Sequence, residues 1–296
     1  MDANVFLPAL TAVLAGVFFV ALLDQWQSRR RGYQLIWALG ILFFGIAVAC
    51  EAIAAAAGWD EPLYRVWYLT GAVWTAGWLG LGNAFLLGRT RFGFAFALCL
   101  FLAGLFTFLT ARRNPEIYAD ASTTAMLYFL VAGVLALAVS VETYFQNWRW
   151  PWMALLAVGG ATLLSIVLMA LATLPAPGYA LDPETGVPTA ELLPPELRLL
   201  TPFMNVSGAF ALILGALFSA YVFMPKKRVL PYSLDQSQSG DQFMFNLLIS
   251  PVAILVNFVA SLPAALMALF TGRINSRVPA TLLIAIGAFI PSVTDS

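Results

Sequence analysis

The sequence contains no histidine, two cysteines and two lysines among 296 residues. Without histidine, the chain offers no His-ligated haem or metal site, no Ser-His or Cys-His catalytic pair and no phospho-accepting histidine. Lys226 and Lys227 follow the end of an apolar run, so no buried amine is available to form a Schiff base with retinal. Several classes of enzyme, metalloprotein and photoreceptor are therefore excluded.

The two cysteines do not suggest a disulfide. Cys50 lies deep in the apolar run at 33–57, whereas Cys99 lies near the start of the run at 92–111. At a rise of about 1.5 Å per residue, their depths differ by roughly 15 Å, which is too far for a disulfide. We interpret both as small packing residues, and we expect neither a metal site nor a cofactor.

Charge is also scarce, at 10% of residues against 61% that are hydrophobic. A soluble domain has about 25% charged and 45 to 50% apolar residues, so the solvent of this chain is a lipid bilayer. The few basic residues form no patch suited to nucleic acid, and that class of partner is excluded. The bilayer is the expected partner, together with other membrane subunits or further copies of the chain.

Long apolar runs predict an all-α, polytopic transmembrane helical bundle. Seven runs are long enough to cross a bilayer, near 4–23, 33–57, 63–87, 92–111, 122–146, 151–173 and 202–225. With the N-terminus outside, the inward connections carry nine basic residues and the outward ones four. This excess favours that orientation in a plasma (inner) membrane, and we expect a prokaryotic protein.

The runs divide the chain into three parts. Residues 1–228 form the predicted seven-helix bundle, 229–244 a cytoplasmic linker, and 245–296 a membrane-embedded C-terminal block. This block is expected to hold an eighth span and a short or re-entrant segment from Pro279. One stripe of polar or small residues on the eighth span should face protein: Asn246, Ser250, Ala253, Asn257, Ser261 and Ala264. The proline-rich stretch at 175–201 is either a lid over the outer face or a solvated connector.

The hairpin at 37–87 should form the centre of the bundle. Glu51 shares a helical face with Gly40, Phe44 and Ala47 and is expected to point into protein. The opposite side, with Leu42, Ile46 and Ile53, should face lipid. On the second helix of the hairpin, small residues at every fourth position form a ridge that another helix can approach closely: Ala72, Ala76, Gly80 and Ala84.

Six polar residues from different spans fall near one depth, in the outer third of the membrane. They are Thr11, Glu51, Thr70, Tyr128, Ser165 and Asn205. We predict that they line a ligand-binding pocket, in which Glu51 holds a ligand or carries a proton. Alternatively, Glu51 is neutral and hydrogen-bonds a neighbouring hydroxyl or amide as an interhelical link.

Two further groups have structural interpretations. Trp37, Asn83, Glu142 and Tyr221 form a layer near the cytoplasmic ends, where Glu142 can pair with Arg149, Arg89 or Arg91. Trp67, Trp74 and Trp78 share one helical face, as packing residues or as the wall of a lipid groove.

The leading hypothesis is a non-enzymatic integral membrane protein, either a ligand-sensing bundle or an accessory subunit of a larger membrane complex. An alternative is a transporter of a small or lipophilic solute, with Glu51 as its proton-coupling carboxylate. A membrane enzyme acting on lipids is a third possibility. No nucleophile elbow, Walker loop, acidic diphosphate motif or metal-spaced cysteine pair supports an enzyme, and no catalytic residue is assigned.

Overall fold

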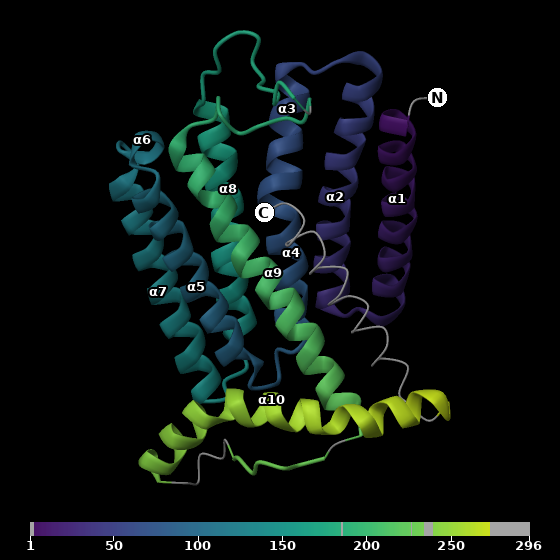
Figure 1. Cartoon of the computed structure of the whole chain (residues 1–296), viewed down its shortest axis with the longest axis vertical. Helices are drawn as coiled ribbons and strands as arrows, with labels where there is room; N and C mark the ends of the chain where they lie inside the picture. Colours follow the sequence, from purple (N-terminus) through teal and green to yellow (C-terminus); the bar gives the residue numbers. More distant parts are fainter. Residues whose placement is uncertain (1–2, 185, 226, 234–238, 273–296) are drawn as a thin grey trace. The chain divides into compact units, whose positions relative to one another are not determined.

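The computed structural model describes residues 3–184, 186–225, 227–233 and 239–272, and these residues are predominantly helical (Figure 1). Within them, the only strand pairing is an isolated bridge between Leu181 and Pro188. In this part of the chain, seven helices are long and apolar enough to cross a membrane. The helical segments are α1 (Ala3–Arg29), α2 (Gly32–Ala57), α3 (Glu61–Trp67), η1 (Tyr68–Trp74), α4 (Thr75–Leu86), α5 (Phe92–Arg113), α6 (Pro115–Tyr118), α7 (Ser122–Tyr144), α8 (Trp150–Leu171), α9 (Pro195–Phe223) and α10 (Gly240–Phe270). The chain is an all-α, multi-pass membrane protein.

The predicted spans are confirmed as helices, with one difference in detail. Six of them are single long helices, and α10 is also a long apolar helix, of 31 residues. The span predicted at 63–87 consists instead of three consecutive helical pieces, α3, η1 and α4, because a π-helix interrupts its α-helical pattern. Hydropathy reports length and apolarity, which are the same for both kinds of helix, so it does not reveal this interruption.

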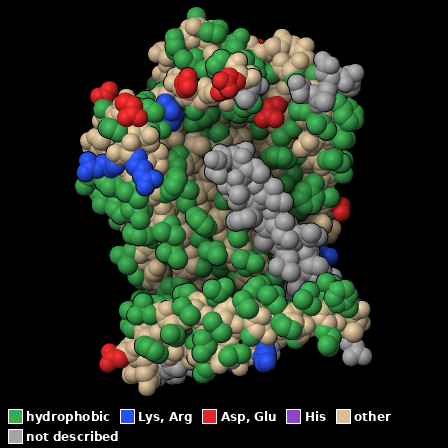
Figure 2. Space-filling model, viewed as in Figure 1, with side chains coloured by type: hydrophobic (Ala, Val, Ile, Leu, Met, Phe, Trp, Pro, Cys, Tyr) green, Lys and Arg blue, Asp and Glu red, His purple; other side chains and the backbone are tan. Residues whose placement is uncertain are grey.

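The described residues fall into two compact units that divide between Gly215 and Ala216. On the face of the first unit shown in Figure 2, hydrophobic side chains cover the middle of the helices, and charged side chains lie toward their ends. This distribution is expected for helices whose middle parts contact lipid tails.

Helix α2 lies between α1 and α4, and this arrangement corrects the predicted lipid face. A side chain at Gly45 would come within 3.2 Å of Ala15 on α1. Leu42 and Ile46 are consequently half-buried rather than lipid-exposed, while Ile53 is exposed as predicted. Phe44, placed on the inward face by its spacing, is 37% exposed. A helix with protein on two sides has no single lipid face, and its periodicity therefore misleads.

The small-residue ridge packs as predicted, and its partner is α9. A Cβ atom at Gly80 would lie 2.5 Å from the carbonyl oxygen of Gly208, so the two backbones are in contact. Next to this crossing, Asn83 donates to the carbonyls of Ala211 and Leu212, at 3.2 and 3.0 Å. The lack of side chains at Gly80 and Gly208 permits the close approach of the two helices. The hydrogen bonds from the Asn83 side chain fix the register of the crossing.

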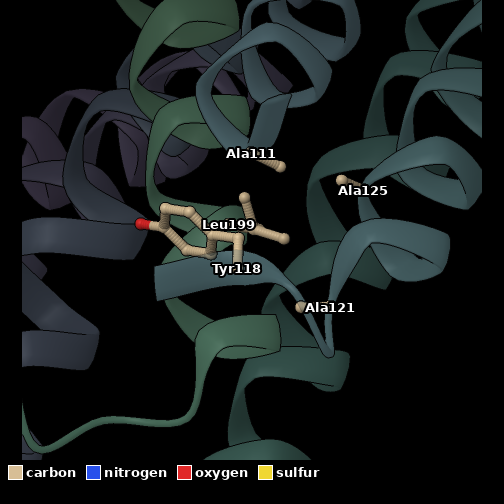
Figure 3. Packing of buried hydrophobic residues seen from close by; sticks show 5 residues of the cluster. All are labelled: Ala111, Tyr118, Ala121, Ala125 and Leu199. Carbon is tan, nitrogen blue, oxygen red and sulfur yellow. The ribbon is translucent and has the colours of Figure 1, made fainter. Parts of the chain in front are cut away.

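A second packing centre joins α5, α6, α7 and α9 (Figure 3). Leu199 of α9 and Tyr118 of α6 are buried together with three alanines that let the helices come close: Ala111, Ala121 and Ala125. The first turns of α9 are thereby anchored beside the 172–194 loop.

The second unit contains α10 and the chain that precedes it. The Oδ1 atom of Asn257 accepts the backbone N–H groups of Val229 and Leu230, at 2.7 and 2.9 Å, and its Nδ2 donates to the Leu230 carbonyl. Ser261 accepts the N–H of Lys227 at 2.8 Å. The predicted polar stripe thus satisfies backbone groups of the non-helical segment before α10.

The predicted stripe needs one correction. Ala264 is exposed, and its neighbour Ala265 is buried instead, packed with Ala220, Tyr221 and Met224. One position of drift is expected for a stripe extrapolated past Pro263, because an internal proline disturbs the helical phase. The segment predicted from Pro279 lies outside the described residues.

Candidate functional site

A π-helix occupies the middle of the helical segment that runs from Glu61 to Leu86. At its end, the N–H of Thr75, the first residue of α4, bonds the carbonyl of Thr70, five residues earlier, and the Thr75 hydroxyl donates to the same oxygen at 2.7 Å. The wider turn inserts residues into the helical register and so redirects the side chains that follow. Such insertions occur frequently at functional sites, which makes this segment the starting point for the site.

Polar side chains on and next to the π-helix bond two other helices. The Tyr68 hydroxyl lies 2.6 Å from the Thr201 hydroxyl of α9. Trp74 donates its indole N–H to Ser165 of α8 at 2.8 Å, and Trp78 donates to Thr162 at 3.1 Å. An indole can only donate, so a hydroxyl on the partner helix is a suitable acceptor. The segment is therefore tied to α8 and α9 by specific bonds as well as by packing.

Glu51 of α2 accepts a hydrogen bond from Trp67 of α3, with 2.9 Å between Nε1 and Oε1. Both side chains are half-buried. This is an interhelical link of the kind expected for Glu51, although the partner is an indole rather than a hydroxyl or an amide. Trp67 consequently bonds α2, whereas Trp74 and Trp78 bond α8, so the three tryptophans do not form one wall.

The other predicted site residues have separate partners. Thr70 donates to Val66 and Thr11 to Leu7, each within its own helix. The Tyr128 hydroxyl donates to the carbonyl of Glu196 at 3.3 Å, and Asn205 is half-buried on α9. Among the described residues, no hydrogen bond joins one of the six predicted residues to another. The pocket predicted from these six residues therefore stays a prediction.

The predicted cytoplasmic layer behaves similarly. Trp37 donates to the Leu79 carbonyl of α4 at 3.2 Å, and Asn83 bonds α9. Glu142 forms no ion pair with a described arginine, and its Oε2 is buried without a hydrogen-bond partner there. The expected pairing of Glu142 with a nearby arginine is therefore not seen.

A hollow of about 420 Å³ lies where α2 ends and α3 begins. We call it the hairpin hollow, and nine residues line it: Cys50, Ile53, Ala57, Gly58, Trp59, Asp60, Pro62, Leu63 and Val66. Cys50 and Cys99 are both free and buried, in agreement with the absence of a disulfide. A set of polar residues at one depth consists of hydroxyl, amide and carboxyl groups, and such a pattern does not indicate this mainly apolar hollow. The sequence signal for it is the turn itself.

Local chemistry explains why the hollow forms at this turn. Asp60 has an extended backbone and accepts the N–H of Leu63 at 2.8 Å, so it caps α3, and Pro62 fits the first turn. The chain therefore reverses between Ala57 and Glu61 and leaves an open space between the two helix ends. Trp59 packs edge-to-face against Trp67, with 5.8 Å between ring centroids. The hollow thus adjoins the Glu51–Trp67 link.

Arg65 on the same helix joins α3 to the end of α8. Its guanidinium bonds Glu61 at 2.6 and 2.8 Å, the Ala172 carbonyl at 2.7 Å and the Met169 carbonyl. A positive charge at the carboxyl end of a helix is favourable because it meets the negative end of the helix dipole. Arg65 thereby holds the start of α3 against α8.

The 172–194 loop packs against α3. The Tyr64 hydroxyl donates to the Thr189 carbonyl. Gly178 has a φ of +88°, and a Cβ there would lie 2.6 Å from the Cβ of Glu61. Of the two expectations for this stretch, the contacts fit a cover better than a fully solvated connector.

No protein-family model, curated protein or solved structure matches this chain. The part of the chain that the structure describes contains no group of three or more acidic, cysteine or histidine residues able to hold a metal ion. The features that bear on function are therefore the contacts of the π-helix and the hairpin hollow.

Proposed function

We propose that the protein is a non-enzymatic sensor of the plasma membrane, in a prokaryotic cell, that binds a ligand in the hairpin hollow. Binding there shifts α3, and the continuous helical segment from Glu61 to Leu86 carries the shift to the opposite side of the bundle. The observation that supports this proposal most directly is the π-helix of Tyr68–Trp74, placed between the hollow and the far end.

Three features favour transmission along this segment. Leu63 and Val66 line the hollow and belong to α3 itself, so an occupant touches the segment directly. The segment covers roughly 35 to 40 Å at about 1.5 Å per residue, which is enough to cross the hydrocarbon core. Near its other end, Asn83 bonds α9, so a displacement of α4 reaches a second helix.

The interrupted register provides the means of movement. A π-type hydrogen bond spans five residues where an α-helical one spans four, and the two forms can exchange by a local shift of hydrogen bonds. Here the shift would move Thr75 from the carbonyl of Thr70 to that of Gly71 and would rotate the residues of α4 relative to α3. Ligand binding selects one register if it prefers that position of α3.

A covalent occupant tests the proposal without knowledge of the ligand. Ile53 lines the hollow and is 53% exposed, so Ile53→Cys, in a chain carrying Cys50→Ala and Cys99→Ala, can be alkylated with a bulky maleimide. The full-length protein is then placed in lipid nanodiscs. We expect hydrogen exchange in the turn at 87–92, at the far end of α4, to change several-fold.

Val134→Cys in the same background is the matched control, because Val134 is 67% exposed on α7 and distant in sequence from the segment. Its alkylation should leave the 87–92 turn unchanged. If alkylation at position 53 alters exchange only near 50–66, the hollow does not communicate with the opposite side and the sensor proposal is wrong.

A further inference from the structure

We propose that the ligand of the hairpin hollow is a lipophilic monocation, a molecule with an apolar body and one positive charge. This inference rests on the proposed function, because it names the ligand class of the same site. Its charge would lie at Trp59 and Asp60, and its apolar body would lie against Ile53, Ala57, Leu63 and Val66. The nine lining residues supply the argument in three parts.

The first part is charge. Asp60 is the only charged residue among the nine, and it is exposed. Capping α3 occupies one of its acceptor sites, since Oδ1 takes the N–H of Leu63, while a carboxylate offers about four such sites. Arg65, the nearest basic residue in sequence, is already engaged with Glu61 and with the carbonyls of Met169 and Ala172 at the end of α8. Asp60 is therefore available to pair with a cation.

The second part is the aromatic ring beside this carboxylate. Trp59 is half-buried, and its edge-to-face contact with Trp67 holds the ring in place. A cation over an indole face is attracted by the negative face of the ring, and more strongly where water is displaced. Trp59 and Asp60 together favour a cation and disfavour an anion.

The third part is the apolar wall. Ile53 and Val66 expose 53% and 43% of their surfaces, and Leu63 and Ala57 join them around the hollow. The volume of about 420 Å³ falls within the usual range of small-molecule sites. A strongly hydrated inorganic cation would leave these apolar side chains exposed to water. A lipophilic cation buries them and gains the corresponding hydrophobic free energy.

The test uses tetraphenylphosphonium and its isosteric anion tetraphenylborate with the full-length protein in lipid nanodiscs. Binding is measured by equilibrium dialysis, and the uptake of protein-free nanodiscs is subtracted. We expect saturable binding of the phosphonium and none of the borate. Asp60→Asn should weaken binding at least tenfold, since Asn still caps α3 but carries no charge. Trp59→Leu should weaken it severalfold.

Glu184→Gln is the matched control, because it removes an exposed carboxylate from the 172–194 loop without touching the hollow. This variant should bind the phosphonium as the unmodified protein does. Equal binding by Asp60→Asn and the unmodified protein, or binding of both ions alike, overturns the proposal. The maleimide experiment at position 53 needs no natural ligand, so failure of the ligand class is distinguishable from failure of the sensor.

Discussion

At the scale of single residues, the interior of the first unit joins helices through aromatic N–H and O–H donors. Trp37, Trp67, Trp74 and Trp78 each donate to an oxygen of a neighbouring helix, and Tyr68 pairs with Thr201. Within a bilayer no water competes for these donors, so an unpaired one is costly. The large rings also fill volume between helices. Each residue therefore contributes both packing and a directional hydrogen bond.

The Glu51–Trp67 pair gives a prediction at this scale. Glu51→Gln keeps an acceptor oxygen, so the bond from Trp67 survives and stability should be nearly unchanged. Glu51→Leu removes the acceptor and should lower the free energy of unfolding by about 1 to 2 kcal/mol, the range for a membrane hydrogen bond. Chemical denaturation of the protein in mixed micelles measures both values.

A double-mutant cycle separates this bond from general packing. Trp67→Phe keeps an aromatic ring and removes the donor. If the hydrogen bond accounts for the loss, the combined Glu51→Leu and Trp67→Phe variant should lose less stability than the sum of the two single variants. The expected coupling free energy is about 0.6 to 1.7 kcal/mol. Strictly additive losses would show that the two residues act independently.

At the scale of helices, close backbone contact decides which neighbours pair. The crossing of α4 and α9 at Gly80 and Gly208 has no room for a Cβ atom, since the one built at Gly80 lies 2.5 Å from a carbonyl oxygen. Lipid and protein interior are equally apolar, so helices associate through fit rather than through burial of apolar area. The small residues therefore matter more here than the large exposed ones.

Gly80→Leu should consequently lower stability by at least about 1 to 3 kcal/mol or prevent folding, because the added side chain forces the helices apart. Gly160→Leu on α8 is the matched control: Gly160 is exposed and nothing lies within 4 Å of a Cβ built there. Thermal unfolding monitored by size-exclusion chromatography compares the two. An equal loss of stability in both variants would show that the α4–α9 crossing is not the cause.

The helices themselves could be predicted from sequence, because runs of twenty apolar residues have only one stable form in lipid. Their neighbours could be predicted only in part. The ridge around Gly80 was visible as a repeat, but the coverage of Leu42 and Ile46 by α1 was not, since a leucine facing lipid and one facing a helix look the same. The π-helix was also hidden, and with it the separation of Trp67 from Trp74.

The hairpin hollow could not be predicted from sequence, for a related reason. Glu51, Thr70, Ser165 and the other polar residues were grouped by their predicted depth in the membrane. Many positions that are far apart within the bundle share one depth. The Thr70 hydroxyl donates to a carbonyl of its own helical segment, and the Ser165 hydroxyl accepts the indole N–H of Trp74. The hairpin hollow depends on how a five-residue turn closes, which is set by the capping of α3 by Asp60 rather than by hydropathy.

At the scale of the whole molecule, orientation determines which side the hollow faces. The α2–α3 turn and the 172–194 loop lie at one end of the first unit, and the α1–α2 and α4–α5 connections lie at the other (Figure 1). The connections at the second end carry Arg29, Arg30, Arg31, Arg89 and Arg91. Retention of these basic residues in the cytoplasm would place the hollow on the outer side, where a ligand arrives from outside the cell.

Cysteine labelling tests this orientation directly. In a chain carrying Cys50→Ala and Cys99→Ala, single cysteines are introduced by Glu184→Cys in the loop and by Ser28→Cys near the end of α1, both at exposed positions. A membrane-impermeant maleimide should label position 184 on intact cells and position 28 only after permeabilisation. Ser239→Cys, before α10, should behave like position 28, because nine basic residues favour that side. Labelling of position 28 with protection of position 184 would reverse the orientation and place the hollow on the cytoplasmic side.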